Sequence, residues 1–369
     1  MSGSIFGKMF RISTWGESHG KALGVVIDGC PAGIEICEDD IQKDLDRRKP
    51  KKNNFSTQRK EDDMVEILSG VFAGKTTGTP ISMIIHNTDK KSADYTQIAE
   101  IYRPGHADYT YDAKYGFRDY RGGGRASGRE TAARVAAGAV ARKMLGMFGI
   151  DVYAYTYSMG EVCIDRENFE RDEINNNAFY MPDKTKVLQM EQYLDEIRKT
   201  GDSIGGIVEC IVTKVPAGMG EPVFEKLDAM LAQALMSIGG AKGVEIGAGF
   251  EVAKMKGSEN NDSFRVDAEK NIIKATNNSG GILGGISDSG DLFMRVALKP
   301  TPSIYQTQKT VNKDKTEVEV QIQGRHDATI VPRAAVVVEA MATITIAEYL
   351  LQNVVANIEN IKKVYTDLR

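Results

Sequence analysis

The hydrophobic pattern of the first 90 residues predicts strands alternating with a helix. Residues 22–29, ALGVVIDG, form an apolar run typical of a buried strand, and the PAG that follows predicts a turn. In 38–48, EDDIQKDLDRR, the acidic residues come early and the basic residues late, as the helix dipole favours. Residues 65–87, VEILSGVFAGKTTGTPISMIIHN, predict two strands around a Gly/Thr turn.

Two further segments have helical spacing. Residues 127–145, SGRETAARVAAGAVARKML, repeat apolar positions at helical intervals, and Ser127 with Glu130 forms a capping-box pattern that marks the start. Residues 333–356 mix alanine and valine with few charges, among them Glu339 and Glu348. We expect this last helix to be buried between layers of the protein rather than to contact a membrane.

The second half of the chain repeats the order of the first. Residues 206–235 contain a strand, a second PAG and a helix, and 279–300 resemble the earlier glycine-rich hairpin. Residues 324–350, beginning GRHDATIVPRAA, resemble 124–145, beginning GRASGRETAARVAA. Four matches in the same order indicate an internal duplication.

We therefore predict one α+β domain covering residues 1–369, built from pseudo-duplicated halves of about 1–200 and 201–369 that share one core. The polar, Asn/Asp-rich segment 163–200 is interpreted as an excursion between the halves. A Pro/Gly/Ser linker of the kind that separates independent domains is absent from the sequence.

Composition narrows the class of protein. A chain of 369 residues with 41% hydrophobic residues can bury a large core. The sequence has no run approaching eighteen apolar residues and no signal-peptide pattern, which predicts a cytoplasmic protein without a membrane partner. The four cysteines, which have no metal-ligand spacing, are expected to be buried reduced thiols, and we predict no metal site.

The charge distribution favours small anionic ligands over nucleic acid. A net charge of −4 argues against nucleic-acid binding by bulk electrostatics. Basic residues nevertheless cluster in two stretches, where they could bind anions locally or form a solvated charged face. The clusters are Arg103, Arg118, Arg121, Arg125, Arg129 and Arg134, and Arg47, Arg48, Lys49, Lys51 and Lys52.

Three of the four histidines lie in aperiodic loops. His19 stands in GESHG, His106 in RPGHAD and His326 in GRHD, whereas His86 ends an apolar strand. A loop histidine is often only a solvated side chain. Arginine in two of these loops favours a second interpretation, because an imidazole beside a bound phosphate is stabilised in its protonated form and can donate a proton.

Residues 115–130, YGFRDYRGGGRASGRE, predict an anion site. Three consecutive glycines allow a ligand to approach the backbone, and a helix N-terminus follows. Arg125 and Arg129 flank that terminus, and a guanidinium can bind phosphate or carboxylate through two hydrogen bonds. The alternative is a flexible glycine loop that binds no ligand.

Two other glycine-rich stretches do not indicate nucleotide binding. SGVFAGKT has Ser69 where a phosphate-binding P-loop needs its first glycine, and we interpret it as a hairpin turn. GGAKGVEIGAG, residues 239–249, lacks the GxGxxG order after a strand.

Several long motifs in one order resemble the chorismate synthase family. They are GESHG, DLDRRKP, TQRKEDDMVEILSGVF, RPGHADYTYDAKYGFRDYRGGGRASGRETAARVAAGA, MSIGGAKGVEIGAGF, GGILGGISDSG, KPTPSI and GRHD, spread over nearly the whole chain. The resemblance implies a lyase that converts 5-enolpyruvylshikimate 3-phosphate to chorismate and phosphate with reduced FMN (FMNH2), as the last step of the shikimate pathway.

The resemblance also implies roles for individual residues. His19 would protonate the departing phosphate, His106 would protonate or steady the reduced flavin, and Asp327 would assist proton removal at the flavin N5. Ser18 and Ser127 would be hydrogen-bonding helpers, and Ser127 could instead serve only as a helix cap. Candidates for binding the substrate, or the flavin phosphate, are Arg48, Arg129 and Arg325, with Ser18. The implied flavin contacts are Arg125, Ala126, Ser127, Gly239, Gly240, Gly284, Lys299, Pro300, Thr301, Pro302, Ser303 and Arg325.

The chain departs from the family pattern in a few places. Asn54 stands where the family usually has an arginine, Ala126 where it has a serine, and Gly128 where it has an alanine. Pro302 replaces a common serine, which removes a hydroxyl and an N–H group.

The resemblance further implies a β-α-β sandwich that assembles into a homotetramer. Because no separate reductase domain is visible, we expect an external reductant, for which NADPH is a candidate. The alternative to the enzyme is a non-catalytic phosphometabolite-binding or nucleotide-binding protein that uses the same arginines.

Overall fold

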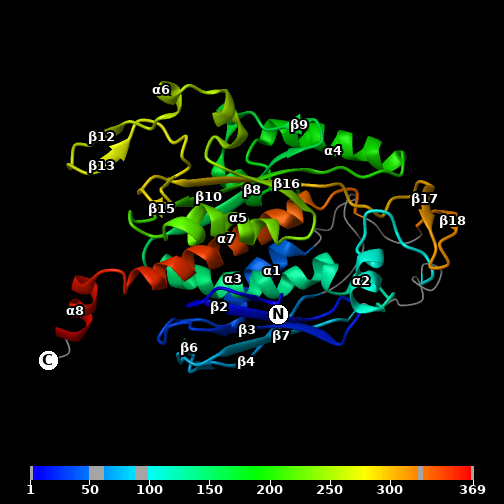
Figure 1. The fold of residues 1–369 in the computed structure, drawn as a ribbon, viewed down its shortest axis with the longest axis horizontal. Helices are drawn as coiled ribbons and strands as arrows, with labels where there is room; N and C mark the ends of the chain where they lie inside the picture. Colours follow the sequence, from blue (N-terminus) through cyan, green and yellow to red (C-terminus); the bar gives the residue numbers. More distant parts are fainter. Residues whose placement is uncertain (1–2, 50–61, 89–98, 323–326, 367–369) are drawn as a thin grey trace.

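Two five-stranded antiparallel sheets enclose a layer of helices in the computed structural model (Figure 1), which describes residues 3–49, 62–88, 99–322 and 327–366. The first sheet comes from the first half of the chain. Its order is β1 (Ile5–Phe6), β2 (Arg11–Gly16), β3 (Ala22–Asp28), β7 (Ile81–His86) and β4 (Val65–Ser69). The second sheet has the order β11 (Ala241–Ile246), β16 (Leu292–Leu298), β10 (Gly206–Thr213), β8 (Asp151–Met159) and β9 (Val162–Cys163).

Four helices fill the space between the sheets. Helices α1 (Glu38–Arg48) and α3 (Thr131–Gly146) pack on the first sheet, and α5 (Leu227–Met236) and α7 (Val331–Asn353) pack on the second. Helices α3 and α7 also pack on each other. They approach closely at Gly138, where a Cβ atom would lie 2.6 Å from the Cβ of Ala340, so a larger side chain has no room.

Helix α7 is apolar on all sides because it is the centre of this layer. Its 18-residue apolar window is long enough to cross a membrane, but 89% of that window is buried inside the protein. The predicted burial is confirmed for residues 334–349, whereas 350–353 are half-buried and 354–356, which follow the helix, are exposed. The helix begins and ends slightly earlier than expected. An all-round apolar helix is the pattern expected for the core of a large domain.

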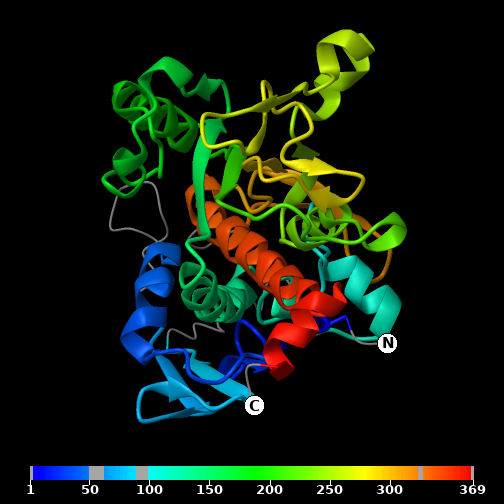
Figure 2. The same cartoon turned by 90° about the vertical axis from the view of Figure 1, so that its left-hand side faces the viewer.

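Smaller elements surround the sandwich. They are β5 (Val71–Phe72) with β6 (Lys75–Thr76), α2 (Asp108–Tyr115), α4 (Lys184–Lys199), α6 (Gly257–Asn260), β12 (Phe264–Val266) with β13 (Ile272–Lys274), β14 (Ile282–Leu283) with β15 (Ile286–Ser287), β17 (Gln308–Val311) with β18 (Glu317–Val320), and α8 (Ile358–Thr366). Figure 1 shows α8 at the opposite side of the molecule from α2, and Figure 2 shows it next to the C-terminus.

The two sheets have the same strand order when the halves of the chain are compared. The order β2-β3-β7-β4 in the first half corresponds to β8-β10-β16-β11 in the second. In each half a helix follows the second of these strands, a short hairpin precedes the third, and a long helix, α3 or α7, comes after that third strand.

The two PAG turns are also held in the same way. The Thr76 hydroxyl donates to the carbonyl of Pro31 at 2.7 Å and accepts from the backbone N–H of Ile34 at 2.9 Å. In the second half the Ser287 hydroxyl donates to the carbonyl of Pro216 at 2.6 Å and accepts from Met219 at 2.9 Å.

A buried carboxylate links three elements of the helix layer. Glu339 of α7 accepts hydrogen bonds from Arg47 of α1, from Arg142 of α3 and from the backbone N–H of Ala154 in β8. Burial opposes ionisation of Glu339, but Arg142 and Arg47 outweigh it and lower its pKa to about 2. The ion pairs therefore fix α7 against both α1 and α3.

Some local predictions were wrong. Ser127 caps the helical segment by accepting from the backbone N–H of Arg129 at 3.2 Å, but Glu130 binds Arg134 instead of closing a capping box. The backbone N–H of Ser127 donates to the Gly124 carbonyl in the preceding turn, so it is not available to Glu130. The excursion 163–200 contains the unpredicted helix α4.

The cysteine prediction was partly wrong about burial. All four cysteines are free thiols, and Cys30 and Cys210 are buried. Cys163 is half-buried, and Cys37 is exposed at the N-cap of α1. The interpretation of SGVFAGKT as a hairpin is confirmed by the pairing of β5 with β6.

Candidate active site

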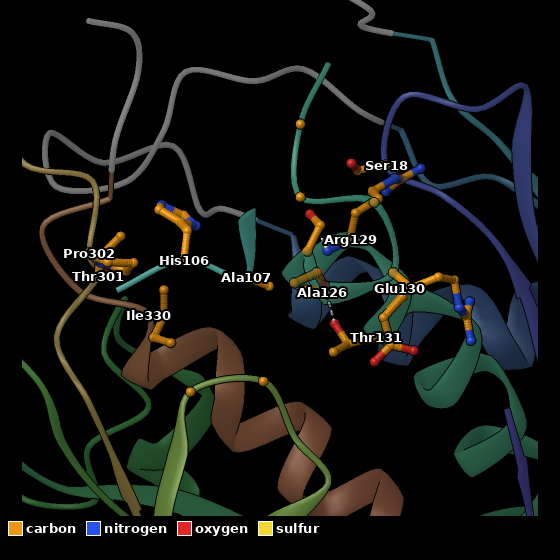
Figure 3. Close-up of a pocket in the computed structure, with 18 of the residues that line it drawn as sticks. Ser18, His106, Ala107, Ala126, Arg129, Glu130, Thr131, Thr301, Pro302 and Ile330 are labelled. Atoms are coloured by element: carbon orange, nitrogen blue, oxygen red, sulfur yellow. Dashed lines mark hydrogen bonds between the residues drawn. The ribbon is translucent and has the colours of Figure 1, made fainter. Parts of the chain in front are cut away.

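A cavity of about 620 Å³, here called the central cavity, opens beside the N-terminal end of α7. Both halves of the chain line it, from Glu17 to Val337. Figure 3 shows His106, Thr301 and Pro302 on one side and Ser18 and Arg129 on the other. A volume in this range suits a small organic ligand.

His19 lies in a tight turn, Glu17–Gly20, that follows β2. The turn closes through a hydrogen bond of 3.0 Å from the Gly20 N–H to the Glu17 carbonyl. Gly122 lies directly against the imidazole: a Cβ atom there would lie 2.3 Å from His19 Cδ2 and 3.0 Å from Ser18 Oγ. The first glycine of RGGG is therefore required for the histidine to fit.

Two buried arginines share one carboxylate at the same side of the cavity. Arg48 and Arg129 each bind a different oxygen of Asp63, and all three side chains are almost completely buried. Burial disfavours the charged Asp63, but the two guanidiniums outweigh it and hold its pKa below the usual range. One carboxylate for two guanidiniums leaves this part of the site net positive.

Asp327 is held by a third arginine. Arg333 Nη1 donates to Asp327 Oδ2 at 2.9 Å, and Arg333 Nε donates to the carbonyl of Arg48 at 3.3 Å. Burial lowers the pKa of Arg333 despite the opposing effect of Asp327. This contact ties the beginning of α7 to the end of α1.

On the other side of the cavity, His106 Nε2 lies 2.7 Å from Ser303 Oγ. Lys299 donates to the carbonyl of Gly105 at 2.6 Å, next to this histidine. Burial, and then the neighbouring charge of Lys242, lowers the pKa of Lys299. Two ammonium groups that repel each other at a cavity would both be stabilised by a bound anion.

The glycine-rich segment exposes backbone to the cavity. A Cβ atom at Gly124 or Gly128 would meet nothing within 4 Å, whereas Gly122 and Gly123 are crowded. Arg125 anchors the segment to β2 by donating to Thr14 Oγ1 at 2.7 Å and to the Gly16 carbonyl at 3.1 Å.

Several arginines of the predicted cluster are used within the protein. Arg103 forms a two-point ion pair with Asp108, at 2.7 and 2.8 Å, and Arg118 also lies beside Asp108. Arg121 pairs with Asp119. Even so, nine arginines and lysines line the cavity against six carboxylates among the residues that the structure describes. This lining is cationic although the chain as a whole is acidic.

Comparisons with a family model, with curated proteins and with solved structures all identify the same family. The family model described as chorismate synthase matches residues 10–351. The chain belongs to the chorismate synthase family. It is 59% identical over 365 residues to chorismate synthase of Lachnoclostridium phytofermentans, which covers 99% of this chain and 100% of that protein. It is 58% identical over 368 residues to that of Agathobacter rectalis, covering 100% of both. A crystal structure of chorismate synthase, 33% identical, superposes with a TM-score of 0.77 over 98% of each chain.

The central cavity brings together most residues that the resemblance to chorismate synthase singled out. They are Ser18, His19, Arg48, His106, Arg125, Ala126, Ser127, Arg129, Gly239, Gly240, Lys299, Pro300, Thr301, Pro302, Ser303 and Asp327. The two histidines therefore open onto one cavity. Arg325, His326, Asn54, Lys51 and Lys52 lie outside the described residues.

Gly284 is not among the residues that line the cavity. It lies in the turn between β14 and β15 with φ +61°, a left-handed conformation that favours glycine. Figure 1 shows β15 far from α2, which contributes to the cavity. Its expected flavin contact therefore stays a prediction, and the left-handed turn by itself would explain the glycine.

Sequence reasoning missed Asp63, Asn87, Lys242 and Arg333. Asp63 lies shortly before β4 and Asn87 directly after β7, and neither carries a local signal for a site. Arg333 could have been noticed, since it is a lone cation within the apolar sequence of α7.

Proposed function

We propose that the chain catalyses the 1,4-elimination of phosphate from 5-enolpyruvylshikimate 3-phosphate to give chorismate, in the central cavity. Membership of the chorismate synthase family supports this activity. The observation that carries the assignment to the cavity is that His19 and His106 share it with an excess of cationic side chains. The substrate has one phosphate and two carboxylates, which require such an environment.

The residues of the cavity fit a flavin as well as the substrate. Among the described residues, Ser18 Oγ, Thr301 Oγ1 and Arg48 Nε are buried without a hydrogen-bond partner in the chain, so they can bind a ligand. The open backbone at Gly124 and Gly239 allows close approach of a planar group. We assign Arg125–Ser127, Gly239, Gly240 and Lys299–Ser303 to holding FMN, and Lys242 lies beside them.

Bound reduced FMN supplies electron density and can receive the hydrogen, without a net redox change. At the other end of the reaction, the C–O bond to phosphate breaks, and charge builds up on the departing oxygen. His19 donates a proton to that oxygen, and Arg48 and Arg129 stabilise its negative charge. Asp63 keeps the two guanidiniums in place without neutralising both.

The other histidine is assigned to the cofactor side. The hydrogen bond with Ser303 orients the His106 imidazole so that it can hold a proton towards the flavin. Asp327, held by Arg333, is assigned to assisting proton removal at the N5 of the bound flavin, which would receive the hydrogen from the C–H bond. Both assignments follow the resemblance of the motifs that contain these residues.

The alternative is a protein that binds a phosphorylated metabolite or nucleotide without turning it over. To distinguish the two, the protein is mixed with FMN, reduced anaerobically and given the substrate, while phosphate release and the flavin spectrum are recorded. Phosphate release with a transient flavin signal supports the enzyme. No release under these conditions leaves only the binding protein.

We also propose that the fold is one duplicated domain over residues 1–369. The shared strand order and the matching PAG turns support the duplication. A homotetramer remains a prediction from the resemblance, and a cytoplasmic location and an external reductant such as NADPH remain predictions from the sequence.

A further inference from the structure

Asn87 connects the histidine of the cavity to its arginines. It directly follows β7 and is 7% exposed. Its backbone N–H donates to the Lys21 carbonyl at 3.1 Å, which places the side chain under the Glu17–Gly20 turn. Asn87 is not among the residues that line the cavity, so it can act on the reaction only through other residues.

The side-chain amide binds both ends of the turn. Asn87 Nδ2 donates to the Glu17 carbonyl at 3.0 Å and to the Gly20 carbonyl at 3.0 Å. An amide nitrogen has two hydrogens, and both are used here. The two accepting carbonyls bracket Ser18 and His19, so the amide fixes the stretch of backbone that carries them.

The amide oxygen of the same side chain binds Arg129. Arg129 Nε donates to Asn87 Oδ1 at 2.9 Å, while its guanidinium also binds Asp63. Asp63 in turn binds Arg48. One asparagine therefore sets the position of the His19 turn relative to a connected pair of buried cations.

We propose that Asn87 is a positioning residue. It fixes the position of His19 relative to Arg129, so that both can act on the departing phosphate. The proposal rests on the proposed function of these two residues. A general acid must lie within hydrogen-bond reach of the leaving oxygen, and the arginines must contact the same group, so their relative position matters more than either position alone.

Two substitutions distinguish the hydrogen bonds that Asn87 donates to the turn from the one that it accepts from Arg129. Asn87→Asp has nearly the same shape and keeps an acceptor for Arg129, but it loses both donors to the turn. We expect kcat to fall about ten- to a hundredfold while KM for the substrate changes less than about threefold. Asn87→Ala loses the Arg129 contact as well, so we expect kcat to fall and KM to rise at least about fivefold.

Asn177 provides a matched control away from the cavity. Its amide nitrogen also donates to two backbone carbonyls, those of Glu173 and Met181, both at 2.8 Å, and its oxygen accepts from Phe179 N–H at 3.0 Å. Asn177→Asp and Asn177→Ala should lower the thermal unfolding midpoint without changing kcat or KM more than about twofold.

The test measures phosphate release with reduced FMN, the affinity for oxidised FMN and the unfolding midpoint of each variant. Loss of kcat in Asn87→Asp with unchanged FMN affinity, and the added rise in KM in Asn87→Ala, support the proposal. Wild-type kcat in a folded Asn87→Asp protein overturns it, as does an equal loss of kcat in Asn177→Asp. If Asn87→Ala does not fold, Asn87→Asp decides. Failure of the wild-type protein to release phosphate would instead contradict the proposed function.

Discussion

At Gly122, the absence of a side chain leaves the room that the His19 imidazole occupies. A methyl group there would collide with the His19 ring and approach Ser18 Oγ, and the backbone φ of +154° adds strain for any side chain. We expect Gly122→Ala to displace the imidazole and to lower turnover at least about tenfold. Phosphate release measures the effect.

Gly146, the last residue of α3, is the control for this substitution. A Cβ atom at Gly146 meets nothing within 4 Å, and the residue does not line the cavity. Gly146→Ala should keep the wild-type rate. Equal rates for the two alanine variants would show that the His19 ring does not depend on the space left by Gly122.

The two histidines can be tested separately. We expect His19→Ala and His106→Ala each to lower turnover about ten- to a thousandfold, or ~1.4–4 kcal/mol of activation free energy, while the fold survives. Circular dichroism checks the fold, and anaerobic phosphate release gives the rate. Unchanged rates in both variants would remove the acid roles assigned to them.

At the scale of elements, Glu339 holds α7 against α1 and α3. Glu339→Gln leaves Arg47 and Arg142 without their shared carboxylate, and we expect a loss of about 3–5 kcal/mol in the free energy of unfolding at pH 7. Urea denaturation of both proteins measures the difference.

The pH dependence of this difference has a defined sign. The folded-state pKa of Glu339, about 2, lies below the usual 4.5, so the ion pairs contribute fully above the usual value. Their contribution is lost as the pH falls from about 4.5 towards 2, and the difference between wild type and Glu339→Gln should shrink over that range. A difference that stays constant there would contradict the assigned pKa.

The strong periodic patterns of the sequence predicted the helices of the central layer. They could not predict contacts between residues that lie far apart in the chain. The charge order of 38–48 predicted α1 with its observed limits, because that pattern is local. The capping box failed because a preceding turn occupies the backbone N–H of Ser127. The roles of Asp63 and Asn87 depend on partners dozens of residues away, such as Arg129, and no local pattern shows such pairing.

At the scale of the whole molecule, large hydrophobic side chains remain exposed at several places. Phe224 is 91% exposed and Phe250 75%, and the hairpin of β12 with β13 exposes Phe264 and Ile272. Exposed apolar residues of this kind are common where copies of a protein associate. If the predicted homotetramer forms, light scattering should give a mass about four times the 40.4 kDa of one chain. A mass near that of a single chain would contradict it.

The central cavity takes its walls from residues as far apart in the chain as Glu17 and Val337. Because synthesis begins at the N-terminus, most of the polypeptide must therefore be made before all the residues that line the cavity are present. A product that stops before α7 lacks the part of the lining that Arg333, Ala334 and Val337 supply, so its cavity is incomplete.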